Sequence, residues 1–468
     1  MDREQIKIHP VNTIVIANIH EYYQWLFPYF DAWEVKAWKW IDHAESDMAL
    51  FWGGDNKLII HPFFPNINFV SHTLEQMRYQ NVRVVSPQRA TESICRDILD
   101  DHSLFNMVVE TIKASSSPEI IAWGATPELY TLVEALNSKG AEVSLSEFPE
   151  RESLWTVRQF DSKVGFRELC MQLRRDHPQV RVTSAVSFAS KTLASHALPG
   201  LLRYMPHGIV VKSENSLGGY GVLVYDNTLK DNPDFVQFDF EGQCRDNCIW
   251  QTGQVVIEEY ICTIADEIIR SPTVQMRIND AGCQIQCIVG QRIEGSQHYI
   301  GSIIAPSLFP PDLEKKLTGI AHIIGQSVFE SGYRGHCDLD FVVDDSLEPV
   351  CVEMNVRRTS ITYALELGQF LLGDGFLNSF TILTAERFHS RSLFGVNYEA
   401  LRSMLTDLLF PLDGQKCGIV LSIVSSLQYF VGEPKLGFVI VGRSYEEAQD
   451  LYKALITRIE RGKSEHKL

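Results

Sequence analysis

The chain has 468 residues, of which 45% are hydrophobic and 22% are charged. This composition excludes disordered, collagen-like and coiled-coil proteins, and the length predicts about three domains. Acidic residues outnumber basic residues by 59 to 42, which leaves a formal net charge of −17. Because nucleic acids and membrane surfaces are also anionic, we expect neither as a partner. An anionic ligand would need a local cluster of cations or a divalent metal.

We expect neither export nor a membrane span. Residues 1–5 have mixed charge and lead into no apolar stretch, which argues against a signal peptide. The longest apolar runs, such as Cys417–Ile423, are far shorter than the ~20 residues that cross a bilayer. Ten cysteines are scattered along the chain, and two CxxxC pairs lack the further ligands of a zinc site. These features predict reduced thiols and a cytoplasmic protein.

The first part of the chain, residues 1–155, alternates strand-like and helix-like stretches. Its clearest unit is the strand Glu119–Gly124 followed by Thr126, a helix cap, and by a helix that begins at Pro127 and ends near Gly140. Residues 141–145 are predicted to form the next strand. Such strand–helix–strand crossovers predict a parallel α/β domain. No GxGxxG follows any strand, so a dinucleotide site is unsupported. Shorter strands are predicted at residues 13–17, 58–60 and 82–85.

The pattern changes in the second part, residues 156–390. Helices are predicted at Lys163–Arg175, near residues 191–203 and at Leu313–Phe329. Strands and helices no longer alternate strictly, which predicts antiparallel sheets with helices on one face. The strands are predicted at residues 180–182, 209–211, 222–224, 255–257, 273–278, 283–289, 341–343 and 350–352.

The last part, residues 391–468, is predicted to be a small α+β region. It contains the strands Gly418–Val424 and Gly437–Val441, a turn at Gly432–Lys435, and a helix over Glu446–Ile459.

A glycine-rich loop follows the apolar strand at residues 209–211. Lys212 ends that strand, and the loop that follows contains Ser216, Gly218 and Gly219 before the next strand begins at Val222. Glycines let backbone N–H groups approach a ligand closely, and a lysine at a strand end suits phosphate. The loop is not a Walker loop, because GxxxxGK[ST] is absent. An ordinary hairpin with an exposed lysine is an equally good interpretation.

The strand Val255–Ile257 runs into Glu258, Glu259, Tyr260 and Ile261, with Glu267 a few residues further on. Such a segment can offer backbone groups and a flat ring to an adenine, and a nearby acid can bind ribose hydroxyls. By itself this pattern also fits a strand that emerges into solvent.

Two neighbouring strands carry acids that converge. Alternation along a strand places Asp338 and Asp340 on one side of the first strand, and Glu353 and Asn355 on one side of the second. Mg²⁺ prefers one or two carboxylates plus substrate phosphates, so these oxygens predict a magnesium site. Arg357 would share their face if the second strand continued. The alternative is a charged, solvated hairpin face.

This order of lysine, glycine-rich loop, Glu-Glu-aromatic segment, Asp and Glu-x-Asn resembles that of the ATP-grasp ligases. The preceding α/β region resembles the pre-ATP-grasp domain of those enzymes, and together the resemblance covers roughly residues 10–390. It implies a parallel α/β domain, then an ATP-grasp fold, then the small α+β region. It also implies ATP and Mg²⁺, with Mn²⁺ as an alternative metal.

The resemblance implies a role for each residue of the motifs. Lys163 resembles the first ATP lysine, and Lys212 the second. Arg357 matches the residue that faces the reactive phosphate. The chain departs from the family at one position. Some members carry an arginine two residues before the metal-binding acid, and here Asp338 occupies that position. Arg277 and Arg292 therefore join Arg357 as candidates for the arginine that stabilises the reacting phosphate. The implied ATP contacts are Lys163, Lys212, Ser216, Gly218, Gly219, Glu258, Tyr260, Ile261 and Glu267, and the implied metal ligands are Asp340, Glu353 and Asn355.

Within the family the chain is most similar to the peptide-ligase-related branch of natural-product pathways. The similarity lies in Trp123–Leu129, Lys435–Gly437 and Glu446–Ala448. A narrower resemblance is to the glutamate–acyl-carrier-protein ligase of butirosin assembly. It implies that a carboxylate, of an amino acid such as glutamate, is activated as an acyl phosphate and passed to a carrier-protein thiol or to an amine. A non-catalytic ATP-binding protein is the remaining alternative.

Overall fold

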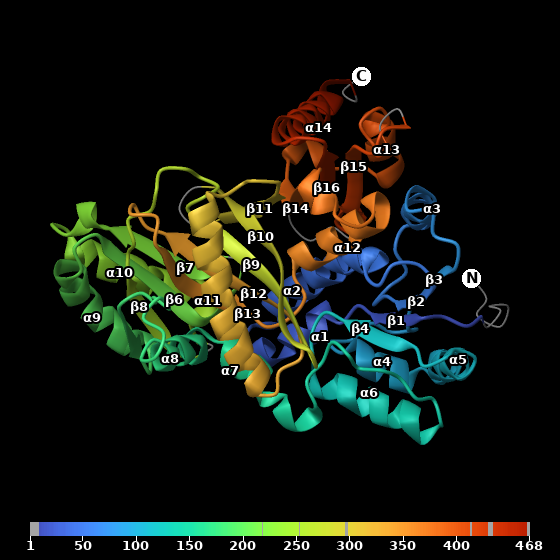
Figure 1. Cartoon of the computed structure of the whole chain (residues 1–468), viewed down its shortest axis with the longest axis horizontal. Helices are drawn as coiled ribbons and strands as arrows, with labels where there is room; N and C mark the ends of the chain where they lie inside the picture. The colour runs from blue at the N-terminus through green and yellow to red at the C-terminus, as the bar shows by residue number, and fades with distance from the viewer. Residues whose placement is uncertain are drawn as a thin grey trace.

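The computed structural model describes residues 9–217, 219–251, 253–294, 298–411, 414–428 and 434–465. Three sheets organise them: a parallel sheet of four strands near the N-terminus, an antiparallel sheet of four strands, and an antiparallel sheet of eight strands (Figure 1). A parallel α/β domain is therefore followed by antiparallel sheets with covering helices, as the sequence predicts. The boundaries at residues 155 and 390 stay predictions.

The parallel sheet has the strand order β3-β2-β1-β4, with β1 in the centre. Thr126 caps α6 by accepting a hydrogen bond from the backbone N–H of Leu129, and Pro127 begins the helix, as the sequence predicts. The predicted strand at residues 141–145 is wrong, because only Ser144 pairs with β4, through a single bridge to Glu119. The elements are β1 (Thr13–Ile16), α1 (Ile19–Tyr23), α2 (Ala32–Glu45), β2 (Lys57–Ile60), α3 (Ile67–Gln76), β3 (Val82–Val85), α4 (Ile94–Asp100), α5 (His102–Lys113), β4 (Glu119–Ala122) and α6 (Pro127–Ser138).

Two helices, α7 and α8, lead from this domain to the smaller antiparallel sheet, whose order is β5-β8-β6-β7. The predicted strand at residues 180–182 is reduced to one bridge between Val182 and Cys351. Helices α9 and α10 pack together beside this sheet (Figure 1). The elements are α7 (Trp155–Asp161), α8 (Lys163–Leu173), β5 (Ala185–Phe188), α9 (Lys191–Tyr204), β6 (Gly208–Leu217), β7 (Tyr220–Asp226), α10 (Pro233–Asp246) and β8 (Val255–Glu259).

The large sheet has the order β13-β12-β9-β10-β11-β14-β16-β15, and each pair of neighbours is antiparallel. The C-terminal strands thus extend the same sheet that carries the predicted metal ligands. The predicted turn at Gly432–Lys435 lies largely outside the described residues. The elements are β9 (Pro272–Asn279), β10 (Gly282–Glu294), β11 (His298–Ile304), α11 (Pro311–Glu330), β12 (Gly335–Val343), β13 (Pro349–Asn355), α12 (Ser360–Leu372), β14 (Thr381–His389), α13 (Tyr398–Leu405), β15 (Gly418–Ile423), β16 (Lys435–Gly442) and α14 (Tyr445–Glu465).

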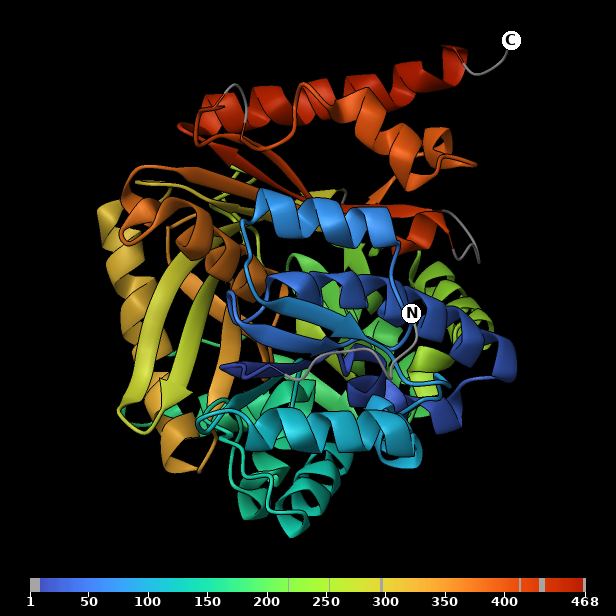
Figure 2. The ribbon, with the colours of Figure 1, turned by 90° about the vertical axis from the view of Figure 1, so that its right-hand side faces the viewer.

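The two faces of the large sheet have different neighbours. Helix α11 covers one face, where Gly325 lies against the sulfur atoms of Met276 and Cys283 (Figure 1). The opposite face is turned toward the smaller sheet and the N-terminal domain. At the far edge, helix α14 packs on β16 and β14, and helix α13 packs against α14 (Figure 2). All ten cysteines are free thiols, and none of the described helices is both long and apolar enough to span a bilayer.

A buried charge cluster joins the N-terminal domain to the large sheet. Glu147, which follows α6, accepts hydrogen bonds of 2.7 and 3.0 Å from Arg358. His336 and Arg277 also approach it, at 3.1 and 3.4 Å. Burial alone would raise the pKa of Glu147, but Arg358 and His336 outweigh it and hold the pKa well below its usual range. The cluster therefore stabilises the contact between the two parts as an ionised network.

The Glu147→Ala variant is expected to lower the free energy of unfolding by about 3–5 kcal/mol, because the buried Arg358 would keep only the partly exposed Glu366 as a carboxylate partner. Urea unfolding of the full chain measures this. The control is Glu134→Ala, which breaks the exposed pair between Glu134 and Arg151 and should change the same quantity by less than about 1 kcal/mol. Equal effects of the two substitutions would contradict a stabilising role of the cluster.

Candidate functional site

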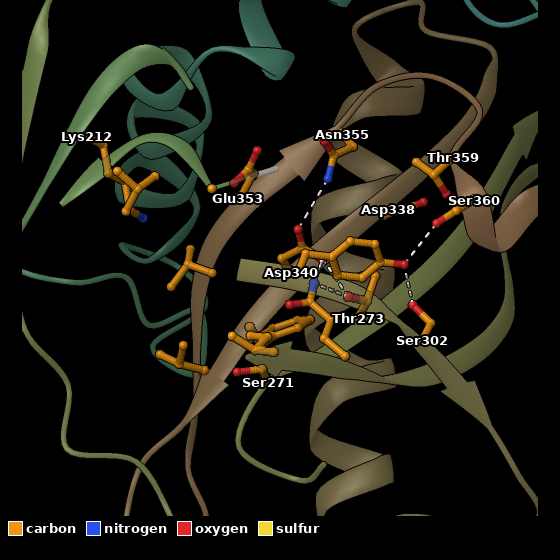
Figure 3. Close-up of a pocket in the computed structure, with 18 of the residues that line it drawn as sticks. Lys212, Ser271, Thr273, Ser302, Asp338, Asp340, Glu353, Asn355, Thr359 and Ser360 are labelled. Atoms are coloured by element: carbon orange, nitrogen blue, oxygen red, sulfur yellow. Dashed lines mark hydrogen bonds between the residues drawn. The ribbon is translucent and has the colours of Figure 1, made fainter. Parts of the chain in front are cut away.

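A cavity of about 600 Å³ lies between the smaller sheet, the large sheet and the N-terminal domain. Strands β6, β7 and β8 line one side, strands β9 to β13 line another, and residues from α1, α2 and the end of β4 close it further. Figure 3 shows Lys212 on one side and Glu353, Asp340 and Asn355 on the other. The cavity therefore brings together residues that belong to separate motifs of the sequence.

Lys212 lies on β6 beside Glu258 on β8. The register pairs Val210 with Glu258, so Lys212 and Glu258 share one face of the smaller sheet, and the lysine Nζ lies 2.9 Å from the carboxylate. Arg167 approaches the other oxygen at 3.1 Å. Burial would raise the pKa of Glu258, but the two cations together lower it. Glu258 is thus a buried, ionised counter-charge for Lys212.

Lys163 begins α8, where Ser162 caps the helix. Its side chain is almost fully buried, with Nζ 2.6 Å from Glu353 Oε1 and 3.3 Å from the carbonyl oxygen of Ser216. Lys163 thereby links the end of β6, next to the glycine-rich loop, to the predicted metal ligands on β13. Gly219 lines the cavity with a φ of +89°, a conformation that favours glycine. Gly218 lies outside the described residues.

The predicted metal ligands lie side by side. Asp340 is paired in register with Glu353, and the amide of Asn355 donates a 3.2 Å hydrogen bond to Asp340 Oδ2. The other oxygen of Asp340 accepts bonds from Thr273 (2.6 Å) and Gln291 (3.0 Å). Burial and the nearby charge of Glu353 raise the pKa of Asp340 to about 7. Two carboxylates that repel each other in this way suit a divalent cation, which would relieve the repulsion.

The donor set is small. Among the described residues no group of three or more His, Cys, Asp or Glu side chains is arranged to hold a metal ion. Two carboxylates and an amide match the way Mg²⁺ is bound beside phosphates, where the substrate and water complete the coordination. Asp338 is buried next to this set, and burial and Asp340 raise its pKa well above its usual range, which favours the neutral acid.

The three candidate arginines are placed differently. Arg357 lines the cavity, donates a 2.9 Å hydrogen bond to Asn355 Oδ1, and lies 5.6 Å from the ring centre of Trp123. Arg277 pairs with Glu147 instead. Arg292 stacks over Tyr452 of α14, 4.2 Å from the ring centre. Neither Arg277 nor Arg292 belongs to the cavity lining, so Arg357 is the best placed of the three.

Only some of the residues predicted to bind adenine and ribose lie at the cavity. Tyr260 and Ile261 line the cavity together with Glu259. Glu267, the predicted ribose acid, is exposed and does not line it. Arg270 and Ser271 are the next lining residues along the chain, and no motif of the sequence singles them out.

A polar row crosses the cavity face of the large sheet. Thr273 on β9 faces Asp340, Gln291 on β10 pairs with Ser302 on β11, and the N–H of Ser302 donates to Thr384 on β14 at 3.1 Å. The hydroxyl of Tyr299 joins Ser302 and Ser360 by bonds of 2.8 and 3.0 Å (Figure 3). This row leads from the predicted metal ligands toward the far end of the cavity.

The far end is built from residues that the sequence motifs do not include. Glu386 and Arg387 of β14, Glu45 of α2, and the rings of Trp38 and Tyr23 line it. Arg387 forms a two-point ion pair with Glu45, at 2.7 and 3.3 Å. Glu386 is only 6% exposed, and neither of its oxygens has a hydrogen-bond partner among the described residues. Burial raises the pKa of Glu386 to about 7. The nearby Thr384 hydroxyl opposes this shift, and the charge of Glu45 adds to it.

No family model and no curated protein sequence matches the chain. Solved structures do resemble it over nearly its whole length. An N5-carboxyaminoimidazole ribonucleotide synthetase in complex with ADP matches with a TM-score of 0.53 and 13% identity, covering 98% of this chain and 99% of the other. A biotin carboxylase from Campylobacter jejuni, in a β,γ-ATP complex, has a TM-score of 0.53 and 11% identity, with 97% and 94% coverage.

The biotin carboxylase domain of Hydrogenobacter thermophilus 2-oxoglutarate carboxylase, crystallised with MgADP, ADP and bicarbonate, has a TM-score of 0.52 and 11% identity. It covers 96% of this chain and 90% of the other. At these identities the comparisons establish the fold, which all three share with this chain.

The Glu386→Gln variant is expected to be more stable than the wild type at pH 8 and similar to it near pH 4.5. Because folding raises the pKa of Glu386 from 4.5 to about 7, its ionisation destabilises the folded state progressively as the pH rises through that window. Glutamine carries no charge, so above pH 7 the variant should gain about 3 kcal/mol in free energy of unfolding relative to the wild type. Urea unfolding at both pH values measures the difference. A difference that does not change with pH would contradict a raised pKa of Glu386 in the folded protein.

Proposed function

We propose that this protein is an ATP-dependent ligase. The observation that supports the proposal best is that the buried Lys212 and the acids of β12 and β13 line one cavity, and that the buried Lys163 pairs with Glu353 of that lining. Lys163 and Lys212 now neutralise Glu353 and Glu258, and both are suited to bind phosphate oxygens instead. The likeness in fold to structures that contain ADP or ATP analogues agrees with a nucleotide in this cavity.

The proposed reaction has two steps. A substrate carboxylate oxygen attacks the γ-phosphorus of ATP, the bond to the β-phosphate breaks, and an acyl phosphate and ADP form. A nucleophile then attacks the acyl carbon, and inorganic phosphate leaves. Catalysis of this kind is mainly positioning and charge stabilisation, and the cations Lys163, Lys212 and Arg357 supply fixed positive charge for it.

The metal-binding proposal rests on Asp340, Glu353 and Asn355. When bound, Mg²⁺ or Mn²⁺ would neutralise the charge of the transferred phosphate. The amide oxygen of Asn355 faces Arg357 and its NH₂ group faces Asp340, so the amide would have to turn over to present its oxygen beside Asp340. For the nucleotide, Tyr260 and Ile261 are proposed to flank the adenine, because they line the cavity on the side of β8. Glu267 is not retained as the ribose acid.

The acid substrate is proposed to be an amino acid such as glutamate, and the acceptor an amine or the thiol of an acyl carrier protein. Both proposals rest on the sequence resemblance to the peptide-ligase-related branch of natural-product pathways. All ten cysteines are free, which suits the reducing cytoplasm that the sequence predicts. The non-catalytic alternative lacks support, because Lys212 and all three predicted metal ligands line the cavity and Lys163 pairs with one of those ligands, Glu353.

The Lys212→Ala and Glu353→Ala variants are expected to lower ADP formation by at least about 100-fold, since each removes a charge at the phosphate-binding part of the cavity. The assay is ADP release with a panel of amino acids in the presence of Mg²⁺. A matched control pair lies outside the cavity: Lys316 and Glu348 form an ion pair beside the β12–β13 hairpin, and Lys316→Ala or Glu348→Ala should leave the rate unchanged. Normal turnover in Lys212→Ala or Glu353→Ala would refute the proposal.

The same assay shows whether the acceptor is an amine or a carrier-protein thiol. With the correct acid, ADP release should rise at least about tenfold when the true acceptor is added, because it consumes the acyl phosphate. Free amines and a phosphopantetheine-loaded carrier protein are added separately, and mass spectrometry identifies an amide or a thioester. If none of the acids in the panel stimulated ADP release, the result would contradict carboxylate activation.

A further inference from the structure

The far end of the cavity forms a second compartment, which we call the distal subsite. It consists of Glu386 and Arg387 of β14, Glu45 and Trp38 of α2, and Tyr23 of α1. The predicted phosphate- and metal-binding residues lie elsewhere in the same cavity. Three strands, β9, β10 and β11, separate β14 from β12, so Asp340 and Glu386 are on the order of 20 Å apart along the sheet. Glu386 is therefore distant from Asp340 along the sheet, whereas the ring of Tyr23 lies 5.8 Å from the guanidinium of Arg357 and the ring of Trp38 lies 5.7 Å from that of Tyr220.

The charges of the distal subsite are unequally paired. Glu45 and Arg387 compensate each other in their two-point ion pair, and Asp42, which also lies near Arg387, contacts His20 at 2.7 Å. Lys435 is close to Arg387 and Glu45, and it is half-buried. Neither oxygen of Glu386 makes a hydrogen bond of ordinary geometry within the described part of the chain, although the residue is more than nine-tenths buried and lines the cavity. The hydroxyls of Thr384 and Tyr363 lie close to its carboxylate.

Aromatic side chains line the same cavity as Glu386, and Tyr299 and Tyr363 lie close to its carboxylate. Tyr23, Trp38 and Tyr299 line the cavity, and Trp123 continues the wall toward Arg357. Aromatic faces attract cations, and they do so more strongly where water is excluded. A buried carboxylate that lacks a partner is costly unless a ligand supplies one. A carboxylate among aromatic rings is the combination that recognises an organic ammonium group.

We propose that the distal subsite binds a positively charged amino group of a substrate, with Glu386 as its counter-charge. This inference rests on the proposed ligase function, because it specifies the chemistry of one of the ligase's substrates. An amine held as an ammonium ion has no free electron pair, and an ammonium group paired with Glu386 lies on the order of 20 Å along the sheet from Asp340. The group bound here is therefore a recognition element on the substrate and not the attacking nucleophile.

The test measures binding to the full chain by isothermal titration calorimetry at pH 8, without nucleotide. The probes are phenethylamine and pentylamine, each compared with the alcohol of the same skeleton. At least one amine should bind about tenfold or more tightly than its alcohol. Glu386→Gln should abolish this preference, Glu386→Asp should retain part of it, and the exposed control Glu142→Gln should leave it unchanged.

Equal binding of amine and alcohol, no binding of either, or a preference that survives in Glu386→Gln would each overturn the proposed subsite. Binding of MgADP is measured in parallel on the wild type and on every variant. It should be unchanged in Glu386→Gln, which also shows that the variant is folded. Failure of the wild type to bind MgADP would instead count against the ligase proposal, so the two failures are distinguishable.

Discussion

The arrangement of the cavity depends on the alternation of side chains along antiparallel strands. Because successive residues of a strand point to opposite faces, the register of the large sheet decides which side chains can meet. Glu353, Asp340 and Thr273 are in register across β13, β12 and β9, and Ser302 and Thr384 continue the same face on β11 and β14. A shift of one residue in any of these strands would turn its polar groups to the opposite face, which α11 covers over β9, β10 and β13.

The charged groups at this face compensate one another in pairs that come from different elements. Lys163 on α8 reaches Glu353 on β13, and Lys212 on β6 reaches Glu258 on β8. In each pair the carboxylate holds the lysine ammonium group in a buried position and a fixed orientation. A phosphate ligand therefore meets preorganised lysines, but it has to compete with the carboxylates for them. A divalent cation would ease that competition at Glu353, because it gives the carboxylate a replacement partner.

The sequence predicts those features that local patterns determine. The acids of β12 and β13 were predictable because they follow a two-residue period on strands joined by a short turn, and Lys212 because it ends an apolar strand. Arg277 and Arg292 could not be assigned from sequence, since their orientation depends on Glu147 and Tyr452, which are more than 100 residues away in the chain. Tyr23, Trp38 and Glu386 carry no local signal at all. Folding alone brings α1 and α2 to β14, and β14 itself was not predicted.

The two ends of the cavity differ in how their acids are compensated, and this difference has a physical consequence. Near β12 and β13, Lys163 pairs with Glu353, and Thr273, Gln291 and Asn355 donate hydrogen bonds to Asp340, although burial and the charge of Glu353 still raise the pKa of Asp340. At β14, Arg387 is engaged by Glu45, and the buried Glu386 has only the neutral hydroxyls of Thr384 and Tyr363 close to its carboxylate, with no ion pair among the described residues. An acid in that position lowers the stability of the empty protein. Its presence in a cavity wall is best explained by a ligand that carries the missing positive charge.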